Sequence, residues 1–161
     1  MLVGNSLGGT AAMWLAAAWP ERVAGLVLVD AALPLPREAR PDRKTIARIG
    51  LASLPGLGEA LYSLFVRFKS ADWQVADGLR RNVADPTRLS AETLRLMYEE
   101  AEERHHRPEL RAPLLSAQRN LLWMLSARRA EVERVAASLT VPTLLVWGSD
   151  DLLVPLVVGQ E

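Results

Sequence analysis

The chain has 161 residues, no cysteine, and 19 basic against 19 acidic side chains, so its formal net charge is zero. This balance argues against nucleic acid and anionic membranes as partners, and the lack of cysteine excludes disulfides, thiolate metal sites and cysteine nucleophiles. The sequence contains no apolar run of the roughly 18 residues that a membrane span needs, and no signal-peptide pattern, so we expect a cytoplasmic protein without membrane contacts.

The chain opens with MLVGNSLGGT, in which G-N-S-L-G follows a short apolar stub. A Gly-x-Ser-x-Gly cluster between a strand and a helix is typical of a nucleophile elbow, in which small residues two positions before and after the serine let the strand and helix approach. Gly4 and Gly8 hold those positions around Ser6. In such a turn the helix N-terminus, with the N–H of Leu7, would stabilise a developing oxyanion.

The segments near both ends of the chain predict an α/β sheet. After the serine cluster, apolar residues at i, i+4 and i+8 and many small residues predict a helix over residues 7–19, which Pro20 ends. The run VAGLVLVDAA then predicts a strand buried on both faces, as in a parallel sheet. TVPTLLVWGSDD near the C-terminus has the same signature.

Residues 34–138 predict helices, because apolar side chains there recur at i, i+3, i+4 and i+7. The apolar stripes are Leu61, Leu64, Phe65 and Phe68, then Leu94, Met97, Tyr98 and Ala101, and finally Val132, Val135, Ala136 and Leu139. The turn signals LPGLG, ADP and PELRAP separate these segments. We therefore predict two core segments, residues 1–33 and 139–161, and a helical insertion over residues 34–138.

Both terminal segments resemble one known family. LVGNSLGGTAAMWLAAAWPERVAGLVLVDAA is similar to the elbow, helix and next strand of the α/β-hydrolase superfamily. LTVPTLLVWGSDDLLVP is similar to the strand and turn that carry the catalytic acid, in the family pattern W-G-x-x-D-x-x-x-P. The resemblance implies the α/β class, with part of the α/β-hydrolase parallel sheet and a large helical cap.

The motifs are most similar to those of carbon–carbon bond hydrolases and related esterases. A serine at the elbow disfavours epoxide hydrolases and haloalkane dehalogenases, which place an aspartate there. The resemblance implies that Ser6 is the nucleophile, that the N–H of Leu7 is one of two oxyanion-hole donors, and that Asp151 orients a histidine base. Asp150, beside Asp151, and Asp30, at the end of the earlier strand, remain alternative acids.

The expected histidine is absent from its place in the chain. In this fold the histidine follows the acid, but no histidine follows Asp151. His105 and His106 precede it and are expected to form a solvated helix end, while Lys44 and Lys69 have no catalytic motif around them. The chain is therefore expected to be an internal piece of a capped serine hydrolase, cut after the first strands and before the histidine.

Two functional hypotheses follow from these motifs. In the first, the chain is part of a Ser-His-Asp hydrolase whose histidine lies outside these residues and which acts on a small-molecule ester or carbon–carbon bond. In the second, it is a catalytically inactive fragment or a noncatalytic binding module of the same fold. We expect no cofactor and no metal, because the sequence shows neither a dinucleotide fingerprint nor a metal-ligand cluster.

Two further expectations concern apolar surfaces. A small parallel sheet without neighbouring strands would expose an apolar edge, so we expect possible self-association. Four apolar residues of the insertion could line a substrate pocket, but their helical spacing favours a role in the core. These residues are Phe65, Phe68, Trp123 and Met124.

Overall fold

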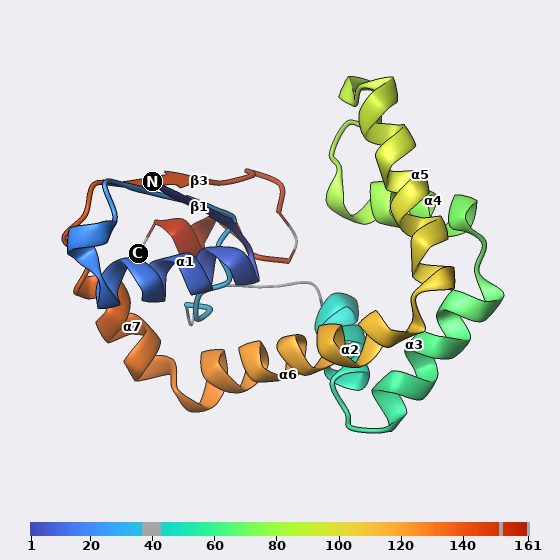
Figure 1. The fold of residues 1–161 in the computed structure, drawn as a ribbon, viewed down its shortest axis with the longest axis horizontal. Helices are drawn as coiled ribbons and strands as arrows, with labels where there is room; N and C mark the ends of the chain where they lie inside the picture. The colour runs from blue at the N-terminus through green and yellow to red at the C-terminus, as the bar shows by residue number, and fades with distance from the viewer. Residues whose placement is uncertain (37–42, 152, 161) are drawn as a thin grey trace. The chain divides into compact units, whose positions relative to one another are not determined.

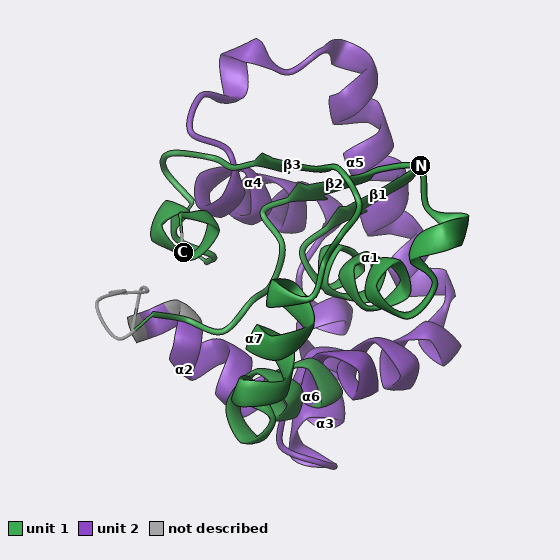
Figure 2. Ribbon diagram, turned by 90° about the vertical axis from the view of Figure 1, so that its left-hand side faces the viewer, with its two compact units in different colours: residues 1–42, 120–161 green, residues 43–119 purple. Residues whose placement is uncertain are grey.

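The computed structural model describes residues 1–36, 43–151 and 153–160. Contacts group the chain into two compact units, residues 1–42 with 120–161 (unit 1) and residues 43–119 (unit 2), as Figure 2 shows. Each unit has its own cluster of buried apolar side chains. The helical insertion predicted over residues 34–138 is wider than unit 2, and its role as a cap stays a prediction.

Unit 1 contains a three-stranded parallel sheet with the strand order β1-β2-β3 (Figure 1). The strands are β1 (Leu2–Asn5), β2 (Leu26–Val29) and β3 (Thr143–Val146). The helices are α1 (Leu7–Ala18) and α7 (Arg129–Ala137), and two 3-10 turns are η1 (Pro20–Arg22) and η4 (Leu156–Gly159). Because all strands run in one direction, their carboxyl ends lie at the same edge of the sheet. This confirms the predicted α/β class with a partial parallel sheet.

Helix α1 packs on one face of β1 and β2 and builds the core of unit 1. Met13 of α1 and Leu26 of β2 are fully buried, and Ala12 and Ala16 let the helix lie close to the sheet. Val132 of α7 is also fully buried in this cluster, as its apolar stripe predicts. Helix α1 ends at Ala18, directly before Trp19 and Pro20, which agrees with the predicted stop.

The prediction that the strands are buried on both faces is wrong. In β2, Leu26 and Leu28 are buried against α1, whereas Val27 and Val29 on the opposite face are only half-buried. All four residues of β3 are exposed. Within unit 1, α1 contacts β1 and β2, and the described residues of that unit place no helix on the Val27 face. The run of apolar residues marks a strand, but it does not show which faces are covered.

Unit 2 is helical. Its helices are α2 (Arg43–Ala52), α3 (Leu57–Phe68), α4 (Ala71–Asn82) and α5 (Ala91–His106), with 3-10 turns η2 (Pro86–Arg88) and η3 (Pro108–Leu110). Helix α6 (Arg111–Ala127) begins in unit 2 and ends in unit 1. Pro113 lies in the first turn of α6, where a missing N–H costs no helical hydrogen bond, so PELRAP marks a helix start as well as a turn.

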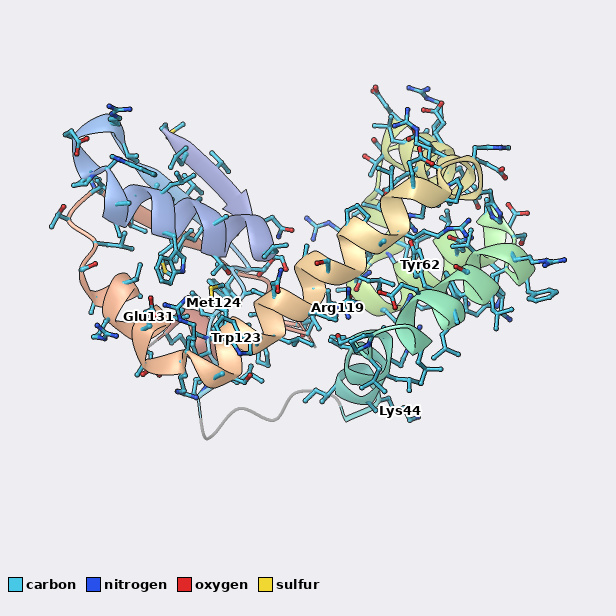
Figure 3. All side chains as sticks on the ribbon, turned by 60° about the horizontal axis from the view of Figure 1, so that its bottom comes forward. Lys44, Tyr62, Arg119, Trp123, Met124 and Glu131 are labelled. Atoms are coloured by element: carbon cyan, nitrogen blue, oxygen red, sulfur yellow. The ribbon has the colours of Figure 1, made fainter. Side chains whose placement is uncertain are left out.

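The apolar stripes of unit 2 are less buried than their spacing predicts. Phe65 is half-buried, stacks on Tyr62 and meets Trp73 edge to face, whereas Phe68 is 71% exposed. In unit 1, Met124 packs against the core cluster, whereas Trp123 is 56% exposed and lies under the guanidinium of Arg128 (Figure 3). The core role is therefore confirmed for Met124 and wrong for Phe68 and Trp123.

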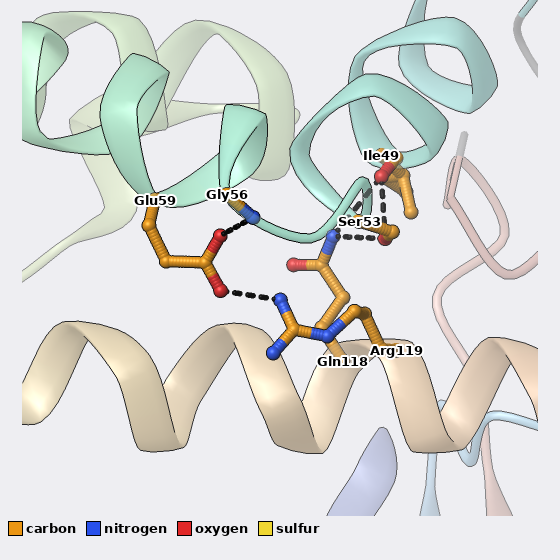
Figure 4. A network of polar contacts seen from close by, with 6 residues as sticks. All are labelled: Ile49, Ser53, Gly56, Glu59, Gln118 and Arg119. Carbon is orange, nitrogen blue, oxygen red and sulfur yellow. Dashed lines mark hydrogen bonds and ion pairs between the residues drawn. The ribbon is translucent and has the colours of Figure 1, made fainter.

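A polar network joins the α2–α3 turn to the first half of α6 within unit 2 (Figure 4). The carboxylate of Glu59 accepts hydrogen bonds from the N–H of Gly56 (2.7 Å) and from Nη1 of Arg119 (2.6 Å). Nε2 of Gln118 donates to the hydroxyl of Ser53 (3.1 Å) and to the carbonyl of Ile49 (3.2 Å). These bonds connect α2, α3 and the part of α6 that belongs to unit 2.

Within the described ranges, no single helix is both long and apolar enough to cross a bilayer. The helical segments Ile46–Ala52 and Leu57–Phe68 together reach that length and composition, but the angle between them is 108°.

Candidate active site

Ser6 occupies the turn between β1 and α1 in a backbone conformation that is rare for a serine. Its φ is 49° and its ψ is −120°, outside the regions that L residues ordinarily adopt. Such a residue costs on the order of 1–3 kcal/mol and persists only where its surroundings impose it. Here the Ser6 N–H donates to the carbonyl of Val29 (3.0 Å), and the Ser6 carbonyl accepts from the N–H of Ala32 (3.1 Å). The next strand and the segment after it therefore hold the turn.

The hydroxyl of Ser6 is not used by the helix that follows it. Ser6 stands at the N-cap position of α1, where a serine side chain ordinarily accepts a hydrogen bond from a backbone N–H of the first turn. No such bond forms here. The usual structural reason for a serine at a helix start therefore does not apply.

The first backbone N–H groups of α1 directly follow Ser6 in the chain. The N–H groups of Gly9 and Thr10 donate to the Ser6 carbonyl, but those of Leu7 and Gly8 have no backbone acceptor among the described residues. Together with the positive end of the helix dipole, they form a place where negative charge is favoured. The N–H of Leu7 is thus without a backbone partner among the described residues, and its role as an oxyanion donor stays a prediction.

Of the two elbow glycines, Gly4 has the role predicted for it and Gly8 does not. A Cβ atom on Gly4 would lie 2.4 Å from the Gly8 carbonyl oxygen, so strand and helix could not approach with a larger residue there. A Cβ atom on Gly8 would meet no atom within 4 Å, so the prediction that Gly8 must be small for this approach is wrong in the described structure. The second crowded position is Gly9, whose Cβ would lie 2.7 Å from that of Ala31.

Asp151 lies in the turn that follows β3, and backbone groups fix its carboxylate. Oδ1 of Asp151 accepts hydrogen bonds from the N–H of Leu153 (2.7 Å) and of Val154 (2.8 Å). The side chain is half-buried. Two donors on one oxygen set the orientation of the carboxylate, and among the described residues no donor is recorded on Oδ2, which suits a residue that orients another side chain.

The two alternative acids have other surroundings. Asp30, with a φ of 42°, accepts a hydrogen bond at Oδ1 from the N–H of Gly148 (2.8 Å). It thereby ties the end of β2 to the end of β3, which is a structural role. Asp150 is exposed, and within the described ranges its carboxylate accepts a hydrogen bond only from the hydroxyl of Ser149 (3.3 Å).

The acid turn is anchored by Trp147. Its indole Nε1 donates to the carbonyl of Val154 (2.9 Å), and its ring lies so close to Gly159 that a Cβ there would be 2.6 Å from it. Sequence reasoning noted Trp147 only as part of a motif and missed Gly159. It also missed Thr10, which is fully buried and whose hydroxyl donates to the carbonyl of Ala32. The signal available in the sequence for Thr10 was a threonine in the first helical turn after Ser6.

The sheet brings Ser6 and Asp151 to the same edge. Ser6 follows β1 and Asp151 follows β3, with β2 and Asp30 between them. Two strand spacings correspond to roughly 10 Å, a gap that a side chain making a hydrogen bond of about 2.8 Å to each group could bridge. The serine, the acid and the helix N-terminus are therefore arranged around one edge.

The histidines belong to unit 2. His105 and His106 are the last two residues of α5, as predicted. His106 is exposed, whereas His105 is half-buried with Nε2 at 3.2 Å from Nε2 of Gln74. Lys44 is exposed on α2, and Lys69 lies over the ring of Trp73 at 4.4 Å. In the part of the chain that the structure describes, no group of three or more histidine, aspartate or glutamate side chains could hold a metal ion.

A family model described as the alpha/beta hydrolase fold matches residues 1–161. The chain belongs to the α/β-hydrolase family. A candidate lipase, Lip1, from Acinetobacter baumannii AYE has a similar solved structure, with a TM-score of 0.61 and 20% identity over 98% of this chain and 46% of that chain. This likeness supports the fold of the α/β-hydrolase family.

Two curated relatives are similar over almost the whole chain. The 2-hydroxy-6-oxononadienedioate/2-hydroxy-6-oxononatrienedioate hydrolase of a Pseudomonas species is 28% identical over 98% of this chain and 48% of its own length. RutD of Klebsiella pneumoniae (strain 342), a candidate carbamate hydrolase, is 31% identical over 96% of this chain and 49% of its own length. The chain thus spans about half the length of these relatives.

Proposed function

We propose that Ser6, Asp151 and the N–H of Leu7 supply the nucleophile, the acid and part of the oxyanion hole of a serine hydrolase. This hydrolase cleaves an ester or carbon–carbon bond in a small molecule. The observation that carries this proposal is the conformation of Ser6, which is strained, held by neighbouring backbone and free of a capping role. The base is a histidine that follows Asp151 in a longer polypeptide. The relatives are about twice as long as this chain, which supports the proposal that the histidine lies in a longer polypeptide.

The chemistry assigns one role to each group. Oγ of Ser6 attacks the carbonyl carbon of the substrate while its proton passes to the histidine. The carbonyl oxygen becomes negatively charged and is stabilised by the N–H of Leu7 and the N-terminus of α1. The bond to the leaving group then breaks, and the leaving group takes the proton from the histidine. Water attacks the acyl-serine in the same way and restores Ser6.

The relatives support this reaction class. One is named for the hydrolysis of oxo-dienedioates and another for that of a carbamate, so attack of water at a carbonyl carbon is common to both names. At 28% and 31% identity they do not decide between an ester and a carbon–carbon bond. We therefore propose the reaction class and not a substrate.

Hydrolysis of a p-nitrophenyl ester tests the proposal in two proteins. These are the 161-residue chain and the extended protein, which includes the polypeptide encoded on either side of it. We expect the chain alone to be nearly inactive, because triad members act as a unit. In the extended protein, Ser6→Ala should lower kcat/KM by roughly 10³-fold or more, and Asp151→Asn by roughly 10²–10⁴-fold.

Asp30→Asn and Asp150→Asn are the matched controls, since each makes the same change in a neighbouring carboxylate. Both variants should keep kcat/KM within a few-fold of the parent. Stop codons closely flanking the chain, or Ser6→Ala retaining activity in the extended protein, would refute the proposal. In the first case the noncatalytic binding module would become the favoured function, and in the second the nucleophile would be a residue other than Ser6.

A further inference from the structure

Unit 2 contains a pocket of about 660 Å³ that lies entirely between its own helices. Its walls come from α2, α3, α4 and α5. Val75 and Ala101 form a buried apolar floor, and Tyr62, Phe65 and Met97 add aromatic and thioether surface. This volume falls in the range of small-molecule sites, and the pocket includes neither Ser6 nor Asp151.

Positive charge is in excess on one side of this pocket. Arg48 and Arg81 both line it, and both turn toward Asp77, with nitrogen–oxygen distances of 3.6 and 2.6 Å. Arg80 lies 3.4 Å from the same carboxylate. Among the described residues, three guanidinium groups therefore share one carboxylate, so about two positive charges are not neutralised within this described cluster.

The rest of the lining does not cancel this excess. The carboxylate among the lining residues is that of Glu100, and it already pairs with Arg104 on the next turn of α5. Arg48 and Arg81 reach the same carboxylate of Asp77, so these cations are crowded, and burial and, secondarily, the positive charge of Arg48 lower the pKa of Arg81. An anion placed beside Arg48 and Arg81 would relieve that crowding.

We propose that this pocket binds a carboxylate with an apolar body of about two rings, its carboxylate on Arg48 and Arg81 and its body on Phe65, Val75 and Met97. A guanidinium matches a carboxylate through two parallel hydrogen bonds, and the apolar walls favour a ligand with a single charge. The site is independent of the proposed hydrolase function. If the pocket does not bind such a carboxylate, the proposed hydrolase function is unaffected.

Isothermal titration of the 161-residue chain with 2-naphthoate and 2-naphthamide tests this site. The two probes have the same ring system and differ in charge. We expect a dissociation constant for 2-naphthoate below about 1 mM and binding of 2-naphthamide that is at least about fivefold weaker. No measurable binding of 2-naphthoate, or equal binding of the two probes, would overturn the proposal.

Three variants locate the site. Arg48→Gln should weaken 2-naphthoate binding by about fivefold or more, whereas Arg95→Gln, an equal charge change on the exposed surface of α5, should leave it unchanged. Gly78→Leu alters no charge. A Cβ on Gly78 meets no atom within 4 Å and Gly78 lines the pocket, so the larger side chain should fill it and weaken both probes. Equal losses in Arg48→Gln and Arg95→Gln, or tight binding by Gly78→Leu, would place the ligand elsewhere.

Discussion

At Gly4 a Cβ atom would lie 2.4 Å from the carbonyl oxygen of Gly8, whereas at Gly8 a Cβ atom would meet nothing within 4 Å. The two glycines flank the same serine and look equivalent in the motif. Their environments show that the elbow depends on contact between the α-carbon of Gly4 and the first turn of α1. The constraint is steric and acts on the strand side of Ser6.

Gly4→Ala and Gly8→Ala form a matched pair that tests this asymmetry. Gly4→Ala should lower the free energy of unfolding by about 2 kcal/mol, because strand and helix must separate to admit the methyl group. Gly8→Ala should raise it by about 0.5–1 kcal/mol, because alanine is the better helix former. Urea unfolding measures both. Equal effects of the two changes would contradict the described packing of the elbow.

The residues of the candidate site differ in how far the sequence predicts them. Ser6 and Leu7 follow from a local motif, because a strand, a tight turn and a helix lie within a few residues. The hydrogen bond from Gly148 to Asp30 joins residues 118 positions apart, so no local pattern contains it. The packing of Trp147 on Gly159 likewise depends on how the acid turn folds back.

Apolar spacing predicts which side chains of a helix are buried in some helices and fails to do so in others. The stripe of α7 lies in the core of unit 1, because Val132 packs beneath α1. The stripe of α3 has the same spacing, yet Phe68 is exposed and Val66, outside the stripe, is fully buried. Spacing identifies a helix but does not say which neighbour covers it. Polar side chains such as Glu59 and Arg119 decide part of that packing.

The pairing of Glu59 with Arg119 makes the stability of unit 2 depend on pH. The hydrogen bond from Arg119 is the main cause that lowers the pKa of Glu59 below its ordinary value of 4.5. The contribution of ionised Glu59 to the stability of the fold is therefore fully present above pH 4.5. It is lost as the pH falls through the lowered pKa of Glu59. Glu59→Gln should destabilise the protein at pH 6 and have a smaller effect near pH 3.

Urea unfolding of the parent and of Glu59→Gln across this pH range checks the prediction. Glu102→Gln is the control, since Glu102 is exposed on α5 and makes no ion pair with another described residue. That variant should track the parent at every pH. A constant difference between Glu59→Gln and the parent from pH 6 to pH 3 would show that Arg119 does not favour the ionised form.

The sheet of unit 1 presents an apolar face. Val3, Val27 and Leu144 are paired across the three strands and point away from α1, and Val3 and Leu144 are 64% and 58% exposed. Both β1 and β3 are edge strands within the described sheet. An exposed apolar row with open edges is a surface on which chains associate.

We expect the 161-residue chain to self-associate through this face. Leu144→Lys places a charge in the apolar row and should shift the chain toward the monomer, as measured by sedimentation velocity. Leu96→Lys, the same change at a 52% exposed leucine of α5, should leave the distribution unchanged. A monodisperse monomer for the parent chain would disprove self-association, and equal shifts in the two variants would place the contact elsewhere.

Labelling by a fluorophosphonate tests most directly whether Ser6 is a nucleophile. The reagent reacts with activated serines, so in the extended protein mass spectrometry of the peptides should find the adduct on Ser6. Ser6→Ala should carry no adduct, Asp151→Asn should react far more slowly, and the 161-residue chain should be labelled little. An adduct on a different serine, or undiminished labelling of Ser6→Ala, would contradict the assignment of Ser6 as the nucleophile.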